Sequence, residues 1–511
     1  MFDALKKYSQ MPGNYSTVHM FDTLYSIISV GLTYTLGGGA KAVDLFGTKL
    51  NKKWKPGEKL QMLFLAYSGA RNTGAESRVA ECIRQVNQVL GEDAVDINMT
   101  TLNLKEAEEY FKGYKVNLTQ INYVFFGSIF KLVLNNHIVS LVEGSCWKEN
   151  FSSALLLYFL YGAGLAAVLG KPSFSYAVDA GEMNRINNFV SWLLSNKTKL
   201  ITRSADSNKV LESIHLPGAI NRVDTAWSMP SESPEWAKQK LMELGWDGKK
   251  PLLGLAFQNY FWWPVIPDLA KFARSKITGK AEYQYKSVYF YDYDKKDRKE
   301  FEAFMKTCAE VVDWAADEYG VQPAIVAMEA LDENACKELI SHMKHSAILI
   351  SCNEYVGTQI AAILRLLKML ITTRYHAMVL SMPGCVPFVG LSRDERIRGV
   401  MKETGLYDDY YVDYRTKDLA GVLKNKINTI LSDEKQASRA SEIIKQNLPY
   451  YYAQMGMLGL DIRDLVREKF PGIHIKDLDE NNVLELVPYI PEEYRASAQK
   501  RFVELKRAEN R

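Results

Sequence analysis

The stretch Leu367–Gly390, LKMLITTRYHAMVLSMPGCVPFVG, decides the fold because apolar runs flank the polar tripeptide Arg374-Tyr375-His376. The pattern predicts a buried strand over Lys368–Thr373, the opening of a helix over Ala377–Met382 and, after the Pro-Gly stop, a second buried strand over Val386–Leu391. These elements form one βαβ unit. In open α/β sheets, ligands bind outside the carboxyl ends of the strands, where a helix start offers N–H groups. The sequence therefore predicts a ligand site at the tripeptide.

The residue types at this site indicate the chemistry of the ligand. Arg374 supplies a planar, permanently charged fork that suits phosphate or carboxylate. His376 supplies an imidazole, which can move a proton near neutral pH. Without further evidence, the same pair could cap a helix or neutralise buried carboxylates. The functional interpretation predicts an anion that reacts.

A family resemblance accompanies these residues. The run TTRYHAMVLSMPGCVPFVGLSRDERIRGVMKETGL resembles the C-terminal signature of the polysaccharide pyruvyl transferase family, which places Arg-x-His there, usually with Leu where this chain has Tyr375. Asn72-Thr73-Gly74-Ala75-Glu76 is similar to the family's Asn-x-Gly-Asp-Glu-like element. Arg203-Ser204-Ala205-Asp206-Ser207 is similar to its Arg-Asp-x-x-Ser element. Three such elements in the right order favour the functional interpretation of Arg374 and His376.

The chain also departs from the family pattern. Ala75 stands where the family has an acidic residue. The family's Gly-Gly-Gly-like loop is replaced by EGSCWKEN, which begins at Glu143-Gly144-Ser145. Glu143 and Trp147 therefore predict an altered acceptor pocket.

Length and composition set the limits of the interpretation. A chain of 511 residues favours two globular domains with extensions. The net charge of +3 gives no overall field for nucleic acid, so we expect no nucleic-acid partner. Six scattered cysteines and the absence of a His/Asp/Glu cluster at ligand spacing predict neither a disulfide framework nor a metal site. The N-terminus does not resemble a secretory signal, which predicts a cytoplasmic protein.

Alternating strands and helices predict an α/β protein with two facing Rossmann-like domains, as in GT-B glycosyltransferases, and extensions at both ends. The expected divisions are an appendage over 1–58, an N-terminal domain over 59–230, a C-terminal domain over 245–430 and a helical extension over 431–511. Among the expected elements are strands over Tyr123–Phe126 and Ser287–Tyr291, a helix over Glu434–Asn447, and a polar tail from about Leu460.

Two apolar segments leave alternatives open. The appendage contains Tyr25–Gly38, YSIISVGLTYTLGG, which is either a helix packed on the first domain or an interfacial helix that rests on a membrane. The segment QNYFWWPVIP, residues 258–267, is core packing by default, with a sugar-stacking platform and a membrane-facing loop as alternatives. Peripheral contact with the inner face of a membrane is therefore a candidate property.

The resemblance implies transfer of a pyruvyl group from phosphoenolpyruvate to a pair of sugar hydroxyls in the biosynthesis of cell-surface glycans. It implies His376 as the general acid and Arg374 and Arg203 as cationic contacts of a small anionic donor. No cofactor besides the donor substrate is expected, and the acceptor is a sugar or a lipid-linked glycan. The remaining substrate-binding candidates are Tyr375, Asn72, Gly74, Glu76, Glu143, Gly144 and Ser145.

Two other functions compete with pyruvyl transfer. A glycosyltransferase of the same architecture would bind a nucleotide sugar in the second domain. An inactive membrane-associated scaffold would explain the departures at Ala75, Glu143 and Tyr375. The identity of the ligand distinguishes the three.

Overall fold

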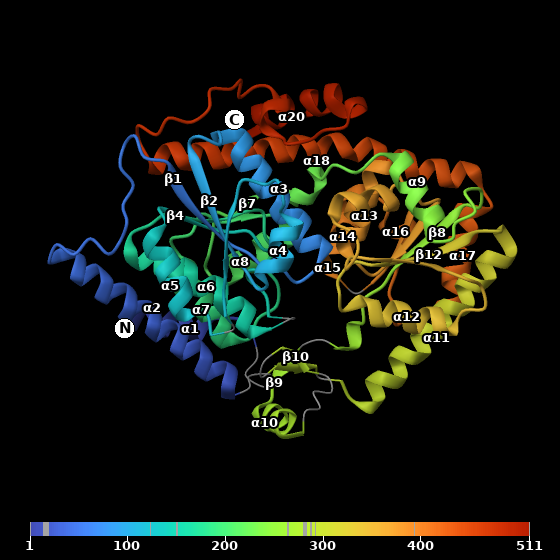
Figure 1. The fold of residues 1–511 in the computed structure, drawn as a ribbon, viewed down its shortest axis with the longest axis horizontal. Helices are drawn as coiled ribbons and strands as arrows, with labels where there is room; N and C mark the ends of the chain where they lie inside the picture. Colours follow the sequence, from blue (N-terminus) through green and yellow to red (C-terminus); the bar gives the residue numbers. More distant parts are fainter. Residues whose placement is uncertain are drawn as a thin grey trace.

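A computed structural model of the chain describes residues 2–13, 20–122, 124–149, 152–262, 265–278, 284–286, 289–291, 293–392 and 394–509. Two parallel sheets lie in neighbouring halves of the molecule, each with helices on both faces (Figure 1). Each sheet is built from short, buried apolar strands separated by amphipathic helices, which is the pattern that a doubly wound sheet requires.

The first sheet has the order β3-β2-β1-β4-β5, and all its neighbouring strands are parallel. Its strands are β1 (Leu60–Leu65), β2 (Val95–Thr101), β3 (Asn117–Gln120), β4 (Ile138–Leu141) and β5 (Ser173–Ser175). A parallel pair, β6 (Ile201–Thr202) and β7 (Ile220–Asn221), follows. The helices are α3 (Thr73–Leu90), α4 (Leu104–Tyr110), α5 (Phe126–Asn135), α6 (Ser153–Leu169), α7 (Arg185–Ser195) and α8 (Ala205–Ser213), with the 3-10 turn η1 (Thr225–Ser228) after β7.

The second sheet has the order β13-β12-β8-β14-β15-β16 and is also parallel throughout. Its strands are β8 (Leu252–Ala256), β12 (Gln322–Ala327), β13 (Ile348–Ser351), β14 (Met369–Thr372), β15 (Phe388–Leu391) and β16 (Tyr411–Val412). The helices are α9 (Pro234–Glu243), α11 (Lys295–Tyr319), α12 (Asp332–His342), α13 (Gly357–Leu364), α14 (Tyr375–Ser381), α15 (Glu395–Thr404), α16 (Tyr407–Tyr410) and α17 (Leu419–Leu431). The βαβ unit predicted at Leu367–Gly390 is therefore confirmed as β14, α14 and β15.

The strand orders fix where a ligand can bind. The connections reverse direction between β1 and β4 in the first sheet, and between β8 and β14 in the second. At such a switch point the loops leave the carboxyl ends of adjacent strands on opposite faces, which opens a crevice. Loops from the two sheets meet here, because the backbone of Asn72 pairs with that of Glu329 and the Thr73 amide donates to the Met328 carbonyl at 2.8 Å.

The C-terminal part differs from expectation. The helix predicted to stop at Asn447 is α18 (Glu434–Lys469), 36 residues that continue through Pro449. A proline inside a helix costs one backbone hydrogen bond, but packing along both sides of Pro449 outweighs that loss. Beyond α18 the chain forms α19 (Val483–Leu486) and α20 (Arg495–Glu509), which pack on α18. The tail expected to be polar from about Leu460 also buries Val483, Leu486 and Phe502. Figure 1 shows α18 running across the top of the view, along both halves of the molecule.

Two predicted strands are also misplaced. Residues 124–126 do not form a strand, because α5 begins at Phe126. The strand of this region is β3, and Tyr123 lies outside the described residues. Tyr289–Tyr291 is β11, but it belongs to a small antiparallel sheet, β10-β11-β9, rather than to the second parallel sheet. That sheet also contains β9 (Val265–Pro267) and β10 (Gln284–Lys286), with α10 (Leu269–Thr278) between them. Ser287 and Val288 lie outside the described residues.

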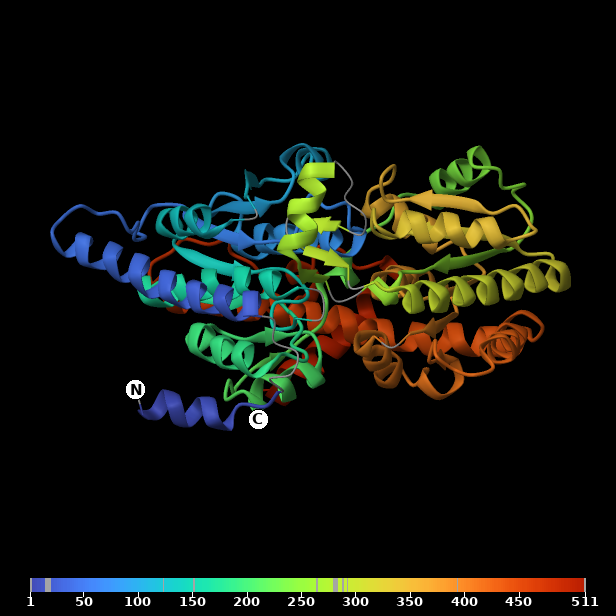
Figure 2. The same cartoon turned by 90° about the horizontal axis from the view of Figure 1, so that it is seen from below.

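The N-terminal appendage forms α1 (Phe2–Gln10) and α2 (Met20–Leu45). Helix α2 packs on α6 and α7 along the outer edge of the first half of the molecule (Figures 1 and 2). Among the residues that the structure describes, no helix combines the length and apolar character needed to cross a membrane.

Candidate active site

Most of the predicted site residues line one small cavity of about 80 Å³ where the loops of the two sheets meet. Seven of them do so: Asn72, Gly74, Glu143, Ser145, Arg374, Tyr375 and His376. The wall is completed by Tyr67, Ala75, Leu155, Met328, Glu329 and Arg396. Arg203, Glu76 and Gly144 lie outside this lining.

The chain topology explains why residues so distant in sequence meet. Asn72 and Gly74 follow β1, and Glu143 and Ser145 follow β4, the two strands at the first switch point. Arg374 follows β14, at the second switch point. Parallel strands deliver the residues after their carboxyl ends to the same edge of a sheet.

Arg374 is held by two carboxylates of its own half of the molecule. Its Nε donates to Asp332 at 2.7 Å and its Nη2 donates to Glu329 at 2.9 Å and to Asp332. Burial alone would lower the pKa of Arg374, but the two carboxylates raise it, so the guanidinium stays charged. No described residue hydrogen-bonds its Nη1, and the side chain lines the cavity. One edge of the fork is therefore available for a ligand.

His376 lies between the halves of the molecule. Its Nε2 is 3.5 Å from Oδ2 of Asp224 and has no closer hydrogen-bond partner among the described residues. The other ring nitrogen rests against Gly74, where a Cβ would come within 2.0 Å of Nδ1. Glycine is required here because any side chain would overlap the imidazole.

Burial lowers the pKa of His376 to about 4; Asp224 opposes this shift, and Arg203 and Arg396 add to it. The imidazole is therefore neutral at pH 7 in the unliganded protein. A bound anion would raise this pKa, since an opposite charge favours the protonated form.

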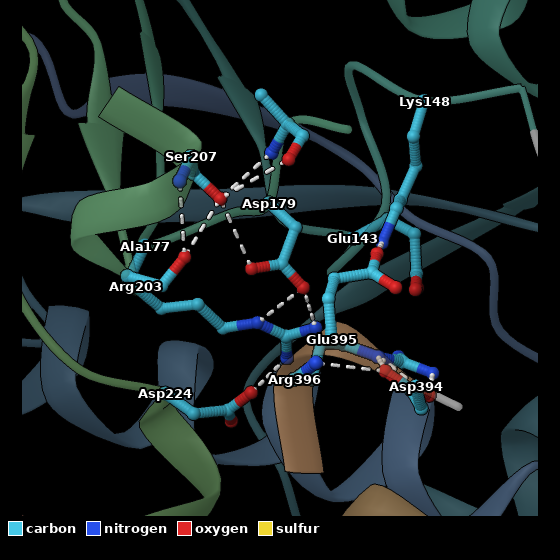
Figure 3. A network of polar contacts seen from close by, with 12 residues as sticks. Glu143, Lys148, Ala177, Asp179, Arg203, Ser207, Asp224, Asp394, Glu395 and Arg396 are labelled. Carbon is cyan, nitrogen blue, oxygen red and sulfur yellow. Dashed lines mark hydrogen bonds and ion pairs between the residues drawn. The ribbon is translucent and has the colours of Figure 1, made fainter. Parts of the chain in front are cut away.

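Arg203 is enclosed on the first side of the site. Figure 3 shows its guanidinium between Asp179 and Asp224, with Nε 2.9 Å from Asp179 and further bonds to both carboxylates. Arg78 also reaches Asp224, at 3.0 Å, and donates to the carbonyls of Tyr176 and Ala177. Although burial opposes ionisation, Arg78 and Arg203 hold the pKa of Asp224 well below its ordinary value.

Tyr375 separates Arg203 from the cavity. The guanidinium carbon of Arg203 lies 4.8 Å from the Tyr375 ring centroid, and that of Arg396 lies 5.5 Å from it. An aromatic ring beside two guanidiniums gains cation–π stabilisation that leucine, the family's usual residue here, would not provide. Tyr375 thus fixes two arginines while exposing part of its ring to the cavity.

Arg396 is a site residue that the sequence argument missed. Its side chain pairs with Asp394 and lines the cavity from the start of α15 (Figure 3). The neighbouring Glu395 forms an ion pair with Lys148 of the first half. The signal was present in SRDERIRG, within the family-like run, but among arginines that follow a predicted strand only Arg374 and Arg203 were considered.

The loop after β4 provides a carboxyl group. Burial raises the pKa of Glu143 above its ordinary value, and its Oε2 has no hydrogen-bond partner among the described residues. Ser145 lines the same wall, whereas Gly144 packs on Arg203, whose Nη2 would be 2.9 Å from an added Cβ. Trp147 does not reach the cavity, because it is fully buried and its indole N–H donates to Ser195 at 3.2 Å. The expected acceptor-pocket role of Trp147 is therefore wrong.

The loop after β1 is braced from beneath by Glu76. Its carboxyl accepts hydrogen bonds from the amides of Gly69 and Arg71, both at 3.2 Å. Burial raises the pKa of Glu76 to about 8, although these two hydrogen bonds act to lower it. Asn72 caps α3 by accepting from the Ala75 amide at 3.1 Å. Glu76 thus shapes the loop, and Asn72 both shapes it and faces the cavity.

The acidic partners of the site were not predicted as functional residues: Asp179, Asp224, Glu329, Asp332 and Asp394. Asp224 is the most connected of them, because it contacts Arg78, Arg203 and His376. In the part of the chain that the structure describes, no three His, Cys, Asp or Glu side chains gather as ligands for a metal ion.

The described aromatic residues of the 258–267 segment belong to the second half of the molecule. Tyr260 and Phe261 belong to the 3-10 turn η2 (Tyr260–Trp262). The Tyr260 hydroxyl lies 2.7 Å from the Ser392 hydroxyl, and the Phe261 ring packs on Phe301 and Phe304 of α11. The core interpretation therefore holds for these two residues. Trp263 and Pro264 lie outside the described residues.

Solved structures with the same arrangement of sheets define the class of fold. The Anabaena HepE protein, solved with UDP-glucose, is 13% identical with a TM-score of 0.51, over 80% of this chain and 100% of that one. A putative UDP-N-acetylglucosamine 2-epimerase from Listeria monocytogenes is 11% identical with a TM-score of 0.51, over 82% and 99%. Staphylococcus aureus MnaA, solved with UDP, is 12% identical with a TM-score of 0.51, over 82% and 99%. The fold is GT-B-like, as the sequence predicted.

Sequence comparison supplies the family. The model of the polysaccharide pyruvyl transferase family matches residues 72–395, a range that holds every predicted site residue. No curated protein matches the chain by sequence. The chain belongs to the polysaccharide pyruvyl transferase family.

Proposed function

We propose that this protein transfers a pyruvyl group from phosphoenolpyruvate to two hydroxyls of a sugar, free or lipid-linked, and so forms a cyclic ketal. The observation that carries the proposal is the single cavity in which Arg374, Arg396 and His376 face Glu143, Ser145 and Asn72. Family membership supports the reaction class. The proposal divides the cavity into a donor side and an acceptor side.

The donor side is cationic and compact. Arg374 offers its Nη1 edge, and Arg396 lies on the same wall, so a phosphate and a carboxylate can each meet a guanidinium. Drug-sized ligands occupy pockets of about 300–1,000 Å³, whereas this cavity has about 80 Å³. A three-carbon acid phosphate suits that space better than a nucleotide sugar. Arg203, the other arginine predicted to contact the donor, lies against the Tyr375 ring and pairs with Asp179 and Asp224, which favours a supporting role.

The proton chemistry begins with donor binding. The dianion raises the pKa of His376 from about 4, and the imidazole takes up a proton. His376 then gives this proton to the methylene carbon of the donor, while the first sugar hydroxyl adds to the neighbouring carbon and loses its proton to the Glu143 carboxylate. Phosphate then leaves, the second hydroxyl attacks the same carbon, and its proton departs with the phosphate. The enol carbon thereby becomes a methyl group, and the two hydroxyl oxygens complete the ketal.

Two competing functions are each suggested by a specific observation. Anabaena HepE was solved with UDP-glucose, so a nucleotide sugar is the competing donor for a GT-B-like fold. The departures at Ala75 and Tyr375 are the motive for an inactive scaffold. Each predicts a different ligand.

Ligand-induced stabilisation separates the three. Melting temperature is measured with phosphoenolpyruvate, inorganic phosphate, UDP-glucose and buffer alone, because a ligand that binds only the native state stabilises it. We expect the largest rise with phosphoenolpyruvate. A rise with UDP-glucose alone would identify a glycosyltransferase, and no rise with any ligand would favour the scaffold.

A pair of variants on one helix tests the donor wall. Arg396→Lys keeps the charge but loses the planar fork, and it should weaken phosphoenolpyruvate binding roughly tenfold. Arg398→Lys, an exposed position two residues along α15, is the matched control and should leave binding unchanged. Equal affinities in the two variants would remove Arg396 from the donor site.

A further inference from the structure

Helix α2 exposes large apolar side chains to solvent, which is unusual for a helix that only packs on the protein. Its outward face presents Leu24, Ile27, Ile28 and Tyr34, which are 54%, 61%, 39% and 47% exposed. Eight of the twelve large hydrophobic side chains that are exposed among the described residues lie between positions 24 and 50. The spacing of these four positions places them along one side of the helix.

The inward face of α2 is small and polar. Ser26, Ser29 and Thr33 are almost fully buried against the protein, and Ser26 donates to Asn187 of α7 at 2.9 Å. Gly37 packs against Val168 of α6, where an added Cβ would lie 2.8 Å from a valine methyl. Tyr25, Val30 and Leu32 are half-buried beside these residues, but the most deeply buried side chains of α2 are hydroxyls and small residues, while leucine and isoleucine are exposed. This departs from the usual amphipathic pattern. The exposed face therefore fits an apolar environment supplied from outside the chain.

The C-terminal end of the same helix adds exposed side chains of two kinds. Leu45 and Phe46 are 85% and 88% exposed, and Figure 1 shows the chain leaving α2 at the outer edge of the molecule. Residues 23–57 contain five lysines and a single acidic residue, Asp44. The lysines, all exposed, are Lys41, Lys49, Lys52, Lys53 and Lys55.

We propose that the outward face of α2 and the lysine-rich segment that follows it form a docking surface for an anionic lipid membrane. Leucine, isoleucine and phenylalanine enter the boundary between headgroups and acyl chains, while the lysines meet the negative headgroups. A second copy of this chain fits less well, because one aspartate cannot neutralise five lysines across a symmetric contact. The helix lies on the membrane and does not span it. The inference does not depend on the reaction catalysed.

Sedimentation with vesicles tests the surface. The full chain is mixed with vesicles of pure phosphatidylcholine, and with vesicles of equal parts phosphatidylcholine and phosphatidylglycerol. We expect binding to the anionic vesicles that weakens as salt rises, and little binding to the neutral ones. Failure to bind the anionic vesicles at low salt would overturn the proposal.

Two double variants separate the apolar and charged contributions. Leu45→Ser with Phe46→Ser should lower vesicle partitioning at least tenfold, and Lys52→Glu with Lys53→Glu should lower it more than twentyfold. The matched controls are Met242→Ser, a half-exposed apolar residue on α9, and Lys295→Glu with Lys299→Glu on α11; both should bind as the wild type does. Equal loss in controls and test variants would contradict a defined surface.

Light scattering without lipid tests the alternative that α2 contacts a second copy of the chain. If α2 instead contacts a second copy, the wild type is a dimer that Leu45→Ser with Phe46→Ser converts to monomer, and vesicle binding is absent. That outcome would replace the membrane with a homodimer. Donor-induced stabilisation measured on the same variants should remain at the wild-type level, so failure of the docking surface and failure of the proposed reaction give different results.

Discussion

The two walls of the cavity differ in charge. The wall from the second sheet presents Arg374, His376 and Arg396, whereas the wall from the first sheet presents Asn72, Ser145 and the acidic Glu143. The first half also contains an arginine, Arg203, but it is closed off behind Tyr375 and paired with two aspartates. Arg374 and Arg203 both follow a predicted strand, yet only Arg374 lines the cavity. Arg203 instead supports the wall behind it. Under the proposed function, the anionic donor would contact the second half and the hydroxyl acceptor the first.

Replacement of His376 gives the largest expected effect. His376→Asn keeps the size of the side chain but cannot deliver the proton, so turnover should fall roughly 10²–10⁴-fold with donor binding nearly intact. Melting temperature and kinetics with a pyruvyl acceptor provide the measurement. A variant that loses melting temperature, with activity falling only in proportion to its folded fraction, would show that His376 is structural.

Replacement of Arg203 tests whether the enclosed arginine is a support. Arg203→Met leaves Asp179 and Asp224 buried with one cation fewer, and should lower the free energy of unfolding by about 3–5 kcal/mol. Arg203→Lys retains the charge and should recover part of that loss. Unchanged denaturant midpoints in the methionine variant would contradict a structural ion-pair network and return Arg203 to the donor-binding candidates.

Gly74→Ala tests the contact between the two walls. The new methyl group would lie 2.0 Å from Nδ1 of His376, so the imidazole must move away from Asp224. Overpacking of this kind costs about 1–3 kcal/mol, and turnover should fall ten- to a hundredfold through displacement of the proton donor. Gly31→Ala, on the open side of α2, has nothing within 4 Å of the added methyl and is the control. Equal activity in both variants would show that His376 moves without consequence.

The smallest effect is in the pH dependence of donor binding. The pKa of His376 is about 4 in the free protein. A bound dianion would raise it, so binding should take up a proton between these two values. Affinity should therefore fall as pH rises through that window, by at most tenfold per pH unit. Calorimetry in two buffers of different ionisation enthalpy measures the uptake. His376→Asn should abolish this part of the proton uptake; an unchanged uptake in that variant would assign the proton to another group.

The site was predictable where local sequence pattern and chain topology coincide. An apolar strand followed by Arg374-Tyr375-His376 indicates a residue at a strand's carboxyl end, and β14 confirms it. Asn72 and Glu143 follow the same logic after β1 and β4. Parallel strands deliver such residues to one edge whatever the details of packing.

The charge partners were not predictable in this way. Asp224 lies in a turn-rich segment and receives Arg78, Arg203 and His376 from three separate elements. No short-range pattern records such pairings, because they arise only when distant segments pack. The unusual burial of α2 was missed for the same reason: its sequence shows an apolar run but not which side meets the protein.

The long helix α18 has a consequence for biosynthesis. Tyr451 stacks on Trp227 with centroids 3.8 Å apart, Gln85 donates to the Met455 carbonyl at 2.7 Å, and Arg222 pairs with Asp461 and Glu509. The first half of the molecule therefore receives part of its cover from a segment that is synthesised much later than its own strands. Domains usually fold in the order of synthesis, but here Trp227 and α3 stay uncovered in the nascent chain until α18 has been made. During that interval it is a natural client for chaperones.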